Sequence, residues 1–283
     1  MEDKMFEVGN TPLLTINTAS GLEVLIKDES KNPFGTFKDR KSREVAEFAK
    51  SADIDYVMAI TSGNYGFSLS NFLSAVGIKT ILFVPYGIDR QIIERLEQKA
   101  IVIEVDLEEQ ELTTEKLESI ARDRLNLAGS KTINATNFYD DVYLDISREI
   151  KRELDKQGRG VDYVVLPCGS GELFAAALRY YHLSNTKVIA VATDNPNTKA
   201  SMLYARHRPP LDRIVSHGNP TRYGLIRANE DEILRAYEWA KGRINCEPSS
   251  AAAFAAFERY KGIFKPSDNI VVLNTGNGLK NFS

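Results

Sequence analysis

The stretch Asn32-Pro33-Phe34-Gly35-Thr36-Phe37-Lys38-Asp39-Arg40 decides the fold of this chain. Its Asn-Pro-Phe-Gly turn follows an apolar run at 22–26 that is typical of a buried strand, and a helix is predicted from 38 to 50. The turn therefore places Lys38 at the head of that helix. The positive end of a helix dipole disfavours an ammonium ion, and a neutral lysine amine can form a Schiff base with an aldehyde. On composition alone, a solvated lysine at a helix start is the simpler interpretation.

Short apolar runs alternate with amphipathic segments along the rest of the chain. The apolar runs predict buried strands at 56–60, 79–84, 101–105, 163–166, 187–191 and 270–273. Helices are predicted between them, at 64–76, 90–99, 113–127, 142–156 and 173–183. Such alternation favours an α/β fold in which parallel sheets are covered by helices on both faces. Ligands of these folds bind beyond the carboxyl ends of the strands.

Two glycine-containing motifs lie at such strand ends. Thr61-Ser62-Gly63-Asn64-Tyr65 follows one predicted strand, and Gly169-Ser170-Gly171-Glu172-Leu173 follows another. Unpaired N–H groups at a helix start favour an anion, and glycine permits close approach of the backbone. Taken alone, Asn64 is also typical of a helix N-cap, and Gly-Ser-Gly of an ordinary turn. The residues by themselves leave both alternatives open.

Length and composition restrict the class of protein. The chain has 283 residues, 43% of them hydrophobic, which can bury the core of one large or two modest domains. The formal net charge of −3 argues against a general nucleic-acid binder. Cys168 and Cys246 form no zinc-like cluster, and no histidine has metal-ligand spacing, so no metal site is expected. Because the sequence has neither a secretory signal nor an apolar run of roughly 20 residues, we expect a soluble, cytoplasmic protein without a membrane partner.

Six motifs resemble, in family order, those of the fold type II enzymes that use pyridoxal 5'-phosphate (PLP), the tryptophan synthase β-like superfamily. The lysine motif at 32–40 has a Phe-Lys-Asp-Arg core that is most like threonine synthase. The other matching motifs are Gly9-Asn10-Thr11-Pro12-Leu13, Thr61-Ser62-Gly63-Asn64-Tyr65-Gly66, Gly169-Ser170-Gly171-Glu172-Leu173, Glu247-Pro248-Ser249-Ser250-Ala251 and Thr275-Gly276-Asn277-Gly278-Leu279-Lys280. A single motif is weak evidence, but six in sequence favour a cofactor role for Lys38.

The resemblance implies a domain organisation. It predicts two three-layer α/β/α domains with mainly parallel sheets, and PLP in the cleft between them. The larger domain is predicted to comprise 1–30 and 139–283, because the N-terminal strand joins it in this family. The smaller domain, at 31–138, is predicted to carry Lys38 and Asn64.

The resemblance also implies a role for each matching residue. Lys38 is expected to bind the PLP aldehyde as a Schiff base, Asn64 to donate to the ring hydroxyl, and Thr275 to meet the ring nitrogen. The residues expected to hold the cofactor phosphate are Gly169, Ser170, Gly171, Glu172 and Leu173. Those expected to line the substrate are Thr61, Ser62, Gly63, Asn64 and Tyr65.

Several of these residues permit a second interpretation. A carboxylate at Glu172 would repel a phosphate unless it points away or serves the helix dipole. Glu247 and Ser249 fit either the edge of the active site or a plain helix start. Phe37 fits either the domain interface or a core. Tyr65 replaces the small residue or threonine of many relatives, so its side chain is expected over the substrate end of the pocket or in the domain cleft, with its hydroxyl bonding a substrate group.

The leading hypothesis for the reaction is a threonine-synthase-like lyase that converts O-phosphohomoserine to threonine and phosphate. The first alternative is a PLP-dependent β-replacement enzyme of the cysteine-synthase type, which Thr61-Ser62-Gly63-Asn64 also permits. The second is a non-catalytic protein that keeps the PLP fold for binding or regulation. In each enzyme hypothesis the substrate is a small amino acid, and a homodimer is expected.

Overall fold

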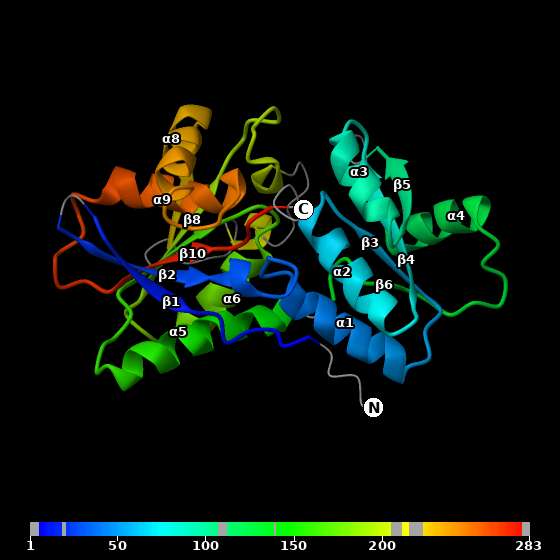
Figure 1. Cartoon of the computed structure of the whole chain (residues 1–283), viewed down its shortest axis with the longest axis horizontal. Helices are drawn as coiled ribbons and strands as arrows, with labels where there is room; N and C mark the ends of the chain where they lie inside the picture. Colours follow the sequence, from blue (N-terminus) through cyan, green and yellow to red (C-terminus); the bar gives the residue numbers. More distant parts are fainter. Residues whose placement is uncertain are drawn as a thin grey trace. The chain divides into compact units, whose positions relative to one another are not determined.

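The computed structural model describes residues 6–18, 21–106, 112–138, 140–204, 211–214 and 223–278. They form two compact units, each with its own sheet (Figure 1). Described residues 6–8 and 38–138 belong to the first unit, and 9–37 and 140–278 to the second. Within the described residues the units divide after residues 8 and 37 and next to residue 139, whereas the sequence predicts divisions after 30 and 138 and places 1–30 wholly in the larger domain.

The second unit contains, in its described part, a six-stranded sheet of order β1-β2-β10-β7-β8-β9. Its strands are β1 (Leu13–Asn17), β2 (Glu23–Asp28), β7 (Tyr163–Pro167), β8 (Lys187–Ala192), β9 (Tyr223–Arg227) and β10 (Ile270–Asn274). Strand β1 pairs antiparallel with β2, and the remaining pairs are parallel. The helices are α5 (Leu144–Lys156), α6 (Glu172–Tyr181), α8 (Glu230–Ala240) and α9 (Pro248–Tyr260).

Alternate residues of these strands face two apolar layers. Val24 and Ile26 of β2 lie in one layer with the buried sides of α8 and α9, whereas Leu25 lies in the other with α5 and α6. Figure 1 shows α8 and α9 on one side of β2 and β10, and α5 on the other. Burial on both faces explains why the parallel strands are continuously apolar. The second unit is thus a three-layer α/β/α structure.

The first unit is built on a parallel sheet of order β5-β4-β3-β6 within its described residues. Its strands are β3 (Tyr56–Ile60), β4 (Lys79–Pro85), β5 (Ile101–Val105) and β6 (Thr132–Asn134), and its helices are α1 (Asp39–Ser51), α2 (Asn64–Ala75), α3 (Arg90–Glu97) and α4 (Thr114–Arg124). Met58 and Phe83 lie in an apolar cluster with Leu117 of α4. Helices α1 and α2 pack together, and α2 also packs on β4. The predicted α/β class with mainly parallel sheets is confirmed.

The differences from prediction lie mainly at short or irregular segments. Strands β1 and β6 were not predicted, and β9 lies at the end of a proline- and glycine-containing stretch, 206–227, that the sequence predicts to be irregular. Helix α8 was also missed. Helix α9 begins at Pro248, so this segment is a helix start, as one of the two interpretations proposed.

Candidate active site

Lys38 directly precedes α1. It occupies the N-cap position with helical backbone angles (φ −64°, ψ −19°) and makes no side-chain cap, while its carbonyl accepts from the Ser42 amide at 2.9 Å. The predicted helix at 38–50 is therefore present, displaced by one residue at each end. The next residues, Asp39 and Arg40, are both buried. The lysine thus stands at the start of a helix whose first two residues are buried.

The ring of Tyr65 lies close to Lys38 and to a second lysine. The Lys38 Nζ atom is 5.7 Å from the ring centroid and the Lys41 Nζ atom is 5.2 Å from it, distances at which an ammonium ion is attracted to an aromatic face. Lys41 is buried, and its Nζ donates to the Thr136 carbonyl at 2.8 Å. Sequence reasoning missed Lys41, although it lies one helical turn after Lys38 on the same side of α1.

The hydroxyl of Tyr65 has a partner within the first unit. It donates to the carbonyl oxygen of Ala135 at 2.7 Å, and the tyrosine is 8% exposed. A phenol carries a single hydrogen, so with this bond made the Tyr65 oxygen can still accept from a substrate group but cannot also donate to one. The role of Tyr65 in a substrate site remains a prediction.

The turn between β3 and α2 is held by the side chain of Thr61. Its Oγ1 accepts from the Gly63 amide at 3.1 Å and from the Gly66 amide at 2.9 Å. With these bonds made, the Thr61 hydroxyl can serve a ligand as a donor. Gly63, with φ 145°, occupies the N-cap position of α2, and Asn64 is the first helical residue. The N-cap interpretation of Asn64 is therefore wrong, because Gly63 occupies that position.

The glycine loop between β7 and α6 is held by main-chain contacts. A β carbon at Gly169 would lie 2.3 Å from the Met202 carbonyl oxygen, and one at Gly171 would lie 2.4 Å from the Leu211 amide nitrogen. The Leu211 amide also donates to the Ser170 carbonyl at 3.2 Å. These glycines are thus required by neighbouring parts of the chain itself.

Helix α6 begins at Glu172, directly after this loop. Gly171 is its N-cap residue, with φ 100°, and the Ser170 hydroxyl accepts from the Glu172 amide at 3.5 Å. Glu172 is buried in the first helical turn, where a carboxylate is favoured by the helix dipole, and Leu173 packs in the core below. The amides of the first turn remain suited to an anion.

Thr275 follows β10 and is 5% exposed. The segment 275–277 pairs with the residues that precede Lys38 in the sequence. The Phe37 amide donates to the Thr275 carbonyl at 2.9 Å, and the Asn277 amide donates to the Gly35 carbonyl at 3.0 Å. The ring of Phe37 packs on Tyr143, with 4.9 Å between the centroids, at the core of the second unit. Phe37 is half-buried and packs against the core of the second unit, and its possible place at a domain interface remains a prediction.

The late Glu-Pro-Ser-Ser-Ala motif forms the start of α9 beside Thr275. The Glu247 amide donates to the Gly276 carbonyl at 3.0 Å, and Ser249 accepts from the Met202 amide at 3.2 Å. Ser250 bonds both Thr275 and Gly276. The sequence motif singled out Glu247 and Ser249, whereas the residue that contacts Thr275 is Ser250. Leu279 and Lys280, the end of the terminal motif, lie outside the described residues.

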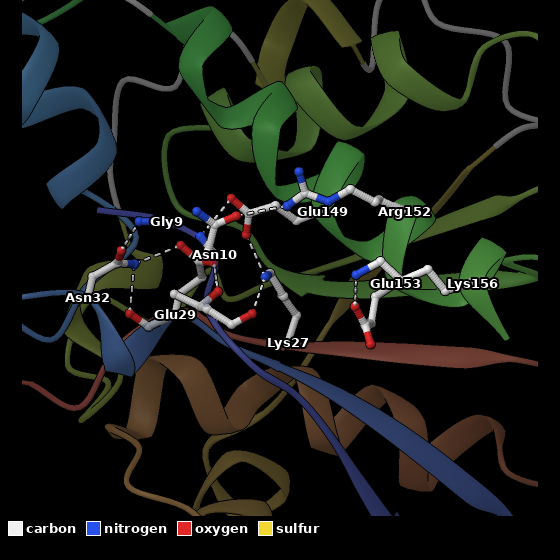
Figure 2. A network of polar contacts seen from close by, with 10 residues as sticks. Gly9, Asn10, Lys27, Glu29, Asn32, Glu149, Arg152, Glu153 and Lys156 are labelled. Carbon is white, nitrogen blue, oxygen red and sulfur yellow. Dashed lines mark hydrogen bonds and ion pairs between the residues drawn. The ribbon is translucent and has the colours of Figure 1, made fainter. Parts of the chain in front are cut away.

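The opening Gly-Asn-Thr-Pro-Leu motif belongs to a polar network on the second unit (Figure 2). Buried Lys27 forms an ion pair with Glu149 of α5 at 2.6 Å, and Glu149 also accepts from the Asn10 amide at 2.9 Å. Thr11 donates to the fully buried Glu29 at 2.6 Å. Removing one partner of a buried ion pair leaves an uncompensated charge, so this network fixes the N-terminal segment to α5. Sequence reasoning missed this network, although Lys27 and Glu29 are charged residues at the end of an apolar run.

The predicted site residues thus fall into two sets. Lys38, Thr61, Ser62, Gly63, Asn64 and Tyr65 lie in the first unit, and Gly169, Ser170, Gly171, Glu172, Leu173 and Thr275 lie in the second. Apart from Lys38, which precedes α1, the residues of each set follow the carboxyl end of a parallel strand, where ligands of such folds bind. The roles of the individual residues remain predictions.

Comparison with known proteins decides the family. A family profile described as pyridoxal-phosphate dependent enzyme matches residues 4–276. This chain belongs to that family. It is a PLP-dependent enzyme of fold type II, and pyridoxal 5'-phosphate is its cofactor.

This PLP enzyme is similar, at low sequence identity, to proteins that are named for different enzyme activities. It is 23% identical to a threonine synthase from Bacillus sp. (strain ULM1) over 301 residues, covering 96% of this chain and 83% of that protein. It is 27% identical to a cysteine synthase from a Flavobacterium species over 232 residues, covering 77% of this chain and 68% of that protein. The solved structure of a hydrogen sulfide-producing enzyme from Fusobacterium nucleatum matches with a TM-score of 0.74 and 22% identity, covering 97% of each chain.

The residues present fit PLP. Helices α2 and α6 each follow a glycine N-cap directly beyond a parallel strand, so the positive end of each helix dipole lies where an anionic group can bind. The buried hydroxyl of Thr275 can meet a pyridine nitrogen without adding charge. Among the described residues, no group of three or more His, Cys, Asp or Glu side chains is placed to hold a metal ion. Every helix in the described ranges is too short or too polar to span a bilayer.

Proposed function

We propose that this enzyme is a threonine-synthase-like lyase that converts O-phosphohomoserine and water to threonine and phosphate. The observation that carries the proposal is the pairing of 35–37 with 275–277, which joins the Phe-Lys-Asp-Arg segment to a threonine at the end of β10. The similarity to a threonine synthase over 96% of the chain supports the same reaction.

Bound PLP supplies an electron sink for charge that develops at the α carbon of the amino acid. Lys38 would hold the cofactor covalently, and its free amine would move protons between Cα, Cβ and Cγ of the substrate. The place of this lysine at the start of α1, with Asp39 and Arg40 buried behind it, keeps its backbone fixed while the long side chain moves. The lysine is therefore the proposed acid and base of the reaction.

The other proposed site residues bind the cofactor or the substrate and orient it. Asn64 donates to the ring hydroxyl, and the amides of the glycine loop hold the cofactor phosphate. Thr61 and Ser62 hold the substrate carboxylate; Thr61 can act there as a donor because its oxygen already accepts the amides of Gly63 and Gly66. The neutral hydroxyl of Thr275 leaves the ring nitrogen largely unprotonated, a weaker electron sink that suits elimination and replacement at the β and γ carbons.

A second candidate is β-replacement of the cysteine-synthase type. It is favoured by the 27% identity to a cysteine synthase, although that alignment covers less of the chain than the threonine-synthase alignment. The Thr61-Ser62-Gly63-Asn64 motif fits either reaction. The two reactions differ in the leaving group, which lies on Cγ in O-phosphohomoserine and on Cβ in O-acetylserine.

Turnover of three substrates by the PLP-loaded enzyme tests the proposal. O-phosphohomoserine, O-acetylserine with sulfide, and serine are assayed side by side, with phosphate, acetate and ammonia as the measured products. We expect phosphate and threonine in equal amounts from O-phosphohomoserine, and a much higher kcat/KM than for the other two substrates. Acetate release with cysteine formation, and no phosphate release, would instead establish the β-replacement reaction.

A further inference from the structure

Two buried hydroxyl groups form a short chain at the end of β10. Ser250, the third residue of α9, is fully buried, and its Oγ lies 2.8 Å from Thr275 Oγ1. The same Ser250 oxygen lies 2.9 Å from the Gly276 carbonyl oxygen. That carbonyl also accepts from the Glu247 amide at 3.0 Å. Ser250 therefore connects the Thr275 hydroxyl to a carbonyl that has another donor.

Each hydroxyl has one hydrogen, so the hydrogen bonds of Ser250 and Thr275 can be arranged in two ways. In the first, Thr275 donates to Ser250 and Ser250 donates to Gly276, so that Thr275 offers only lone pairs to a ligand. In the second, Ser250 donates to Thr275, and the Thr275 hydrogen can point to a ligand. The Gly276 carbonyl stays bonded in both arrangements because it keeps the Glu247 amide. The hydrogen bonds of the two hydroxyl groups can thus reverse their direction without leaving the buried Gly276 carbonyl unpaired.

The ligand decides between the two arrangements. An unprotonated pyridine nitrogen is an acceptor and needs a donor, which only the second arrangement provides. A protonated nitrogen would need an acceptor and would place a positive charge beside two neutral hydroxyls, which is costly in a buried site. A hydroxyl that itself accepts a hydrogen bond is a better donor, because bonds in a chain polarise one another. Ser250 therefore strengthens donation from Thr275.

We propose that Ser250 is a positioning residue that directs the Thr275 hydrogen onto the ring nitrogen of bound PLP and thereby keeps that nitrogen unprotonated. The inference rests on the proposed function, which places Thr275 at the ring nitrogen. Ser250 does not touch the cofactor in this account and acts through Thr275. Its neighbour Ser249 bonds the Met202 amide, so the motif supplies two serines with different tasks.

The test uses cofactor labelled with ¹⁵N at the ring nitrogen, and reads its chemical shift in the reconstituted protein between pH 6 and 9. The variants are Ser250→Ala, Thr275→Val and the matched control Ser147→Ala, which removes another buried serine hydroxyl from a helix of the same unit. We expect an unprotonated, pH-independent nitrogen in the wild type and in Ser147→Ala. In Ser250→Ala and Thr275→Val we expect a shift that changes with pH, and PLP binding weaker by about threefold to tenfold.

The outcomes separate this inference from the proposed function. If the wild type does not bind the labelled cofactor, the proposed function fails. If it binds but Ser250→Ala keeps the wild-type shift and affinity, the positioning role is overturned, and the same holds if only Thr275→Val changes the shift. A protonated nitrogen in the wild type also overturns it. Should Ser250→Ala not fold, Ser250→Cys, whose thiol is a weak donor, is expected to give an intermediate pH dependence.

Discussion

Two turns from strand to helix occupy equivalent places in the two units and are held in different ways. The turn from β3 to α2 and the turn from β7 to α6 both have a glycine N-cap with positive φ. The first is held by the hydroxyl of Thr61, which accepts from the amides of Gly63 and Gly66 at 3.1 and 2.9 Å. In the second, the Ser170 hydroxyl accepts from the Glu172 amide only at 3.5 Å, and the main chain at Met202 and Leu211 leaves no room for a β carbon. Two turns with similar sequence motifs are thus stabilised by different contacts.

The largest expected effect is the loss of the main-chain contact at Gly171. Gly171→Val combines a side chain at φ 100° with a β carbon 2.4 Å from the Leu211 amide nitrogen, so we expect a loss of about 3 kcal/mol in the free energy of unfolding. Urea unfolding measures it. The control Gly158→Val, at φ 67° with no atom within 4 Å of the new β carbon, is expected to lose only about 1–2 kcal/mol. Equal losses in Gly171→Val and Gly158→Val would show that the close contact with Leu211 does not contribute to the requirement for glycine at position 171.

A smaller loss is expected when the side chain that holds the first turn is changed. Thr61→Val removes the oxygen that accepts two amides, and we expect unfolding to require about 2 kcal/mol less. Thr61→Ser keeps the oxygen and is expected to lose less than half as much in the same urea titration. If Thr61→Ser is as unstable as Thr61→Val, the methyl group rather than the hydroxyl holds the turn.

The contact between Thr61 and Gly66 gives a double-mutant test of the same turn. A β carbon at Gly66 would lie 2.5 Å from Thr61 Cγ2, the atom that Thr61→Ser removes. We therefore expect Gly66→Ala to be less damaging by about 1 kcal/mol when combined with Thr61→Ser than when made alone. Additive losses of stability in chemical unfolding would mean that the Leu82 side chain, 2.9 Å from that β carbon, and not Thr61, is what excludes a side chain at position 66.

The smallest effect is expected for Tyr65→Phe. The change removes the bond to the Ala135 carbonyl and keeps the ring beside Lys38, so we expect a loss of about 0.5–1 kcal/mol in stability. Because that hydroxyl already donates within its own unit, the ratio of kcat/KM between amino-acid substrates should remain that of the wild type. A change of tenfold or more in this ratio would assign the hydroxyl to substrate recognition after all.

The sequence predicts the regular parts of the fold well because their signal is local. The predicted strands at 56–60 and 101–105 coincide with β3 and β5, since 56–60 is continuously apolar and 101–105 is interrupted only by Glu104. Strand β1 ends in Thr-Ile-Asn, and the three-residue β6 has a single apolar residue, so neither stands out as an apolar run. The strands that sequence reasoning missed, β1, β6 and β9, all lie at the edge of a sheet.

The candidate site is predictable to the level of its turns but not of the contacts that hold them. The motifs correctly mark the residues beyond β3, β7 and β10. The partners that fix Tyr65, Gly169 and Gly171 are main-chain atoms of distant residues, and a main-chain atom leaves no signature in the sequence. Ser250 lay inside a recognised motif, yet its contact with Thr275 depends on how α9 meets the end of β10. Such contacts follow only from the tertiary structure.

Covalent labelling of the PLP-loaded enzyme tests the central claim most directly. The protein is reduced with borohydride, digested and analysed by tandem mass spectrometry, in the wild type, in Lys38→Ala and in Lys41→Ala. We predict that the reduced cofactor is attached to Lys38, that Lys41→Ala keeps the label, and that Lys38→Ala is folded and carries none. A label on Lys41 or on any other lysine of the wild type, or one that persists in Lys38→Ala, would contradict the account.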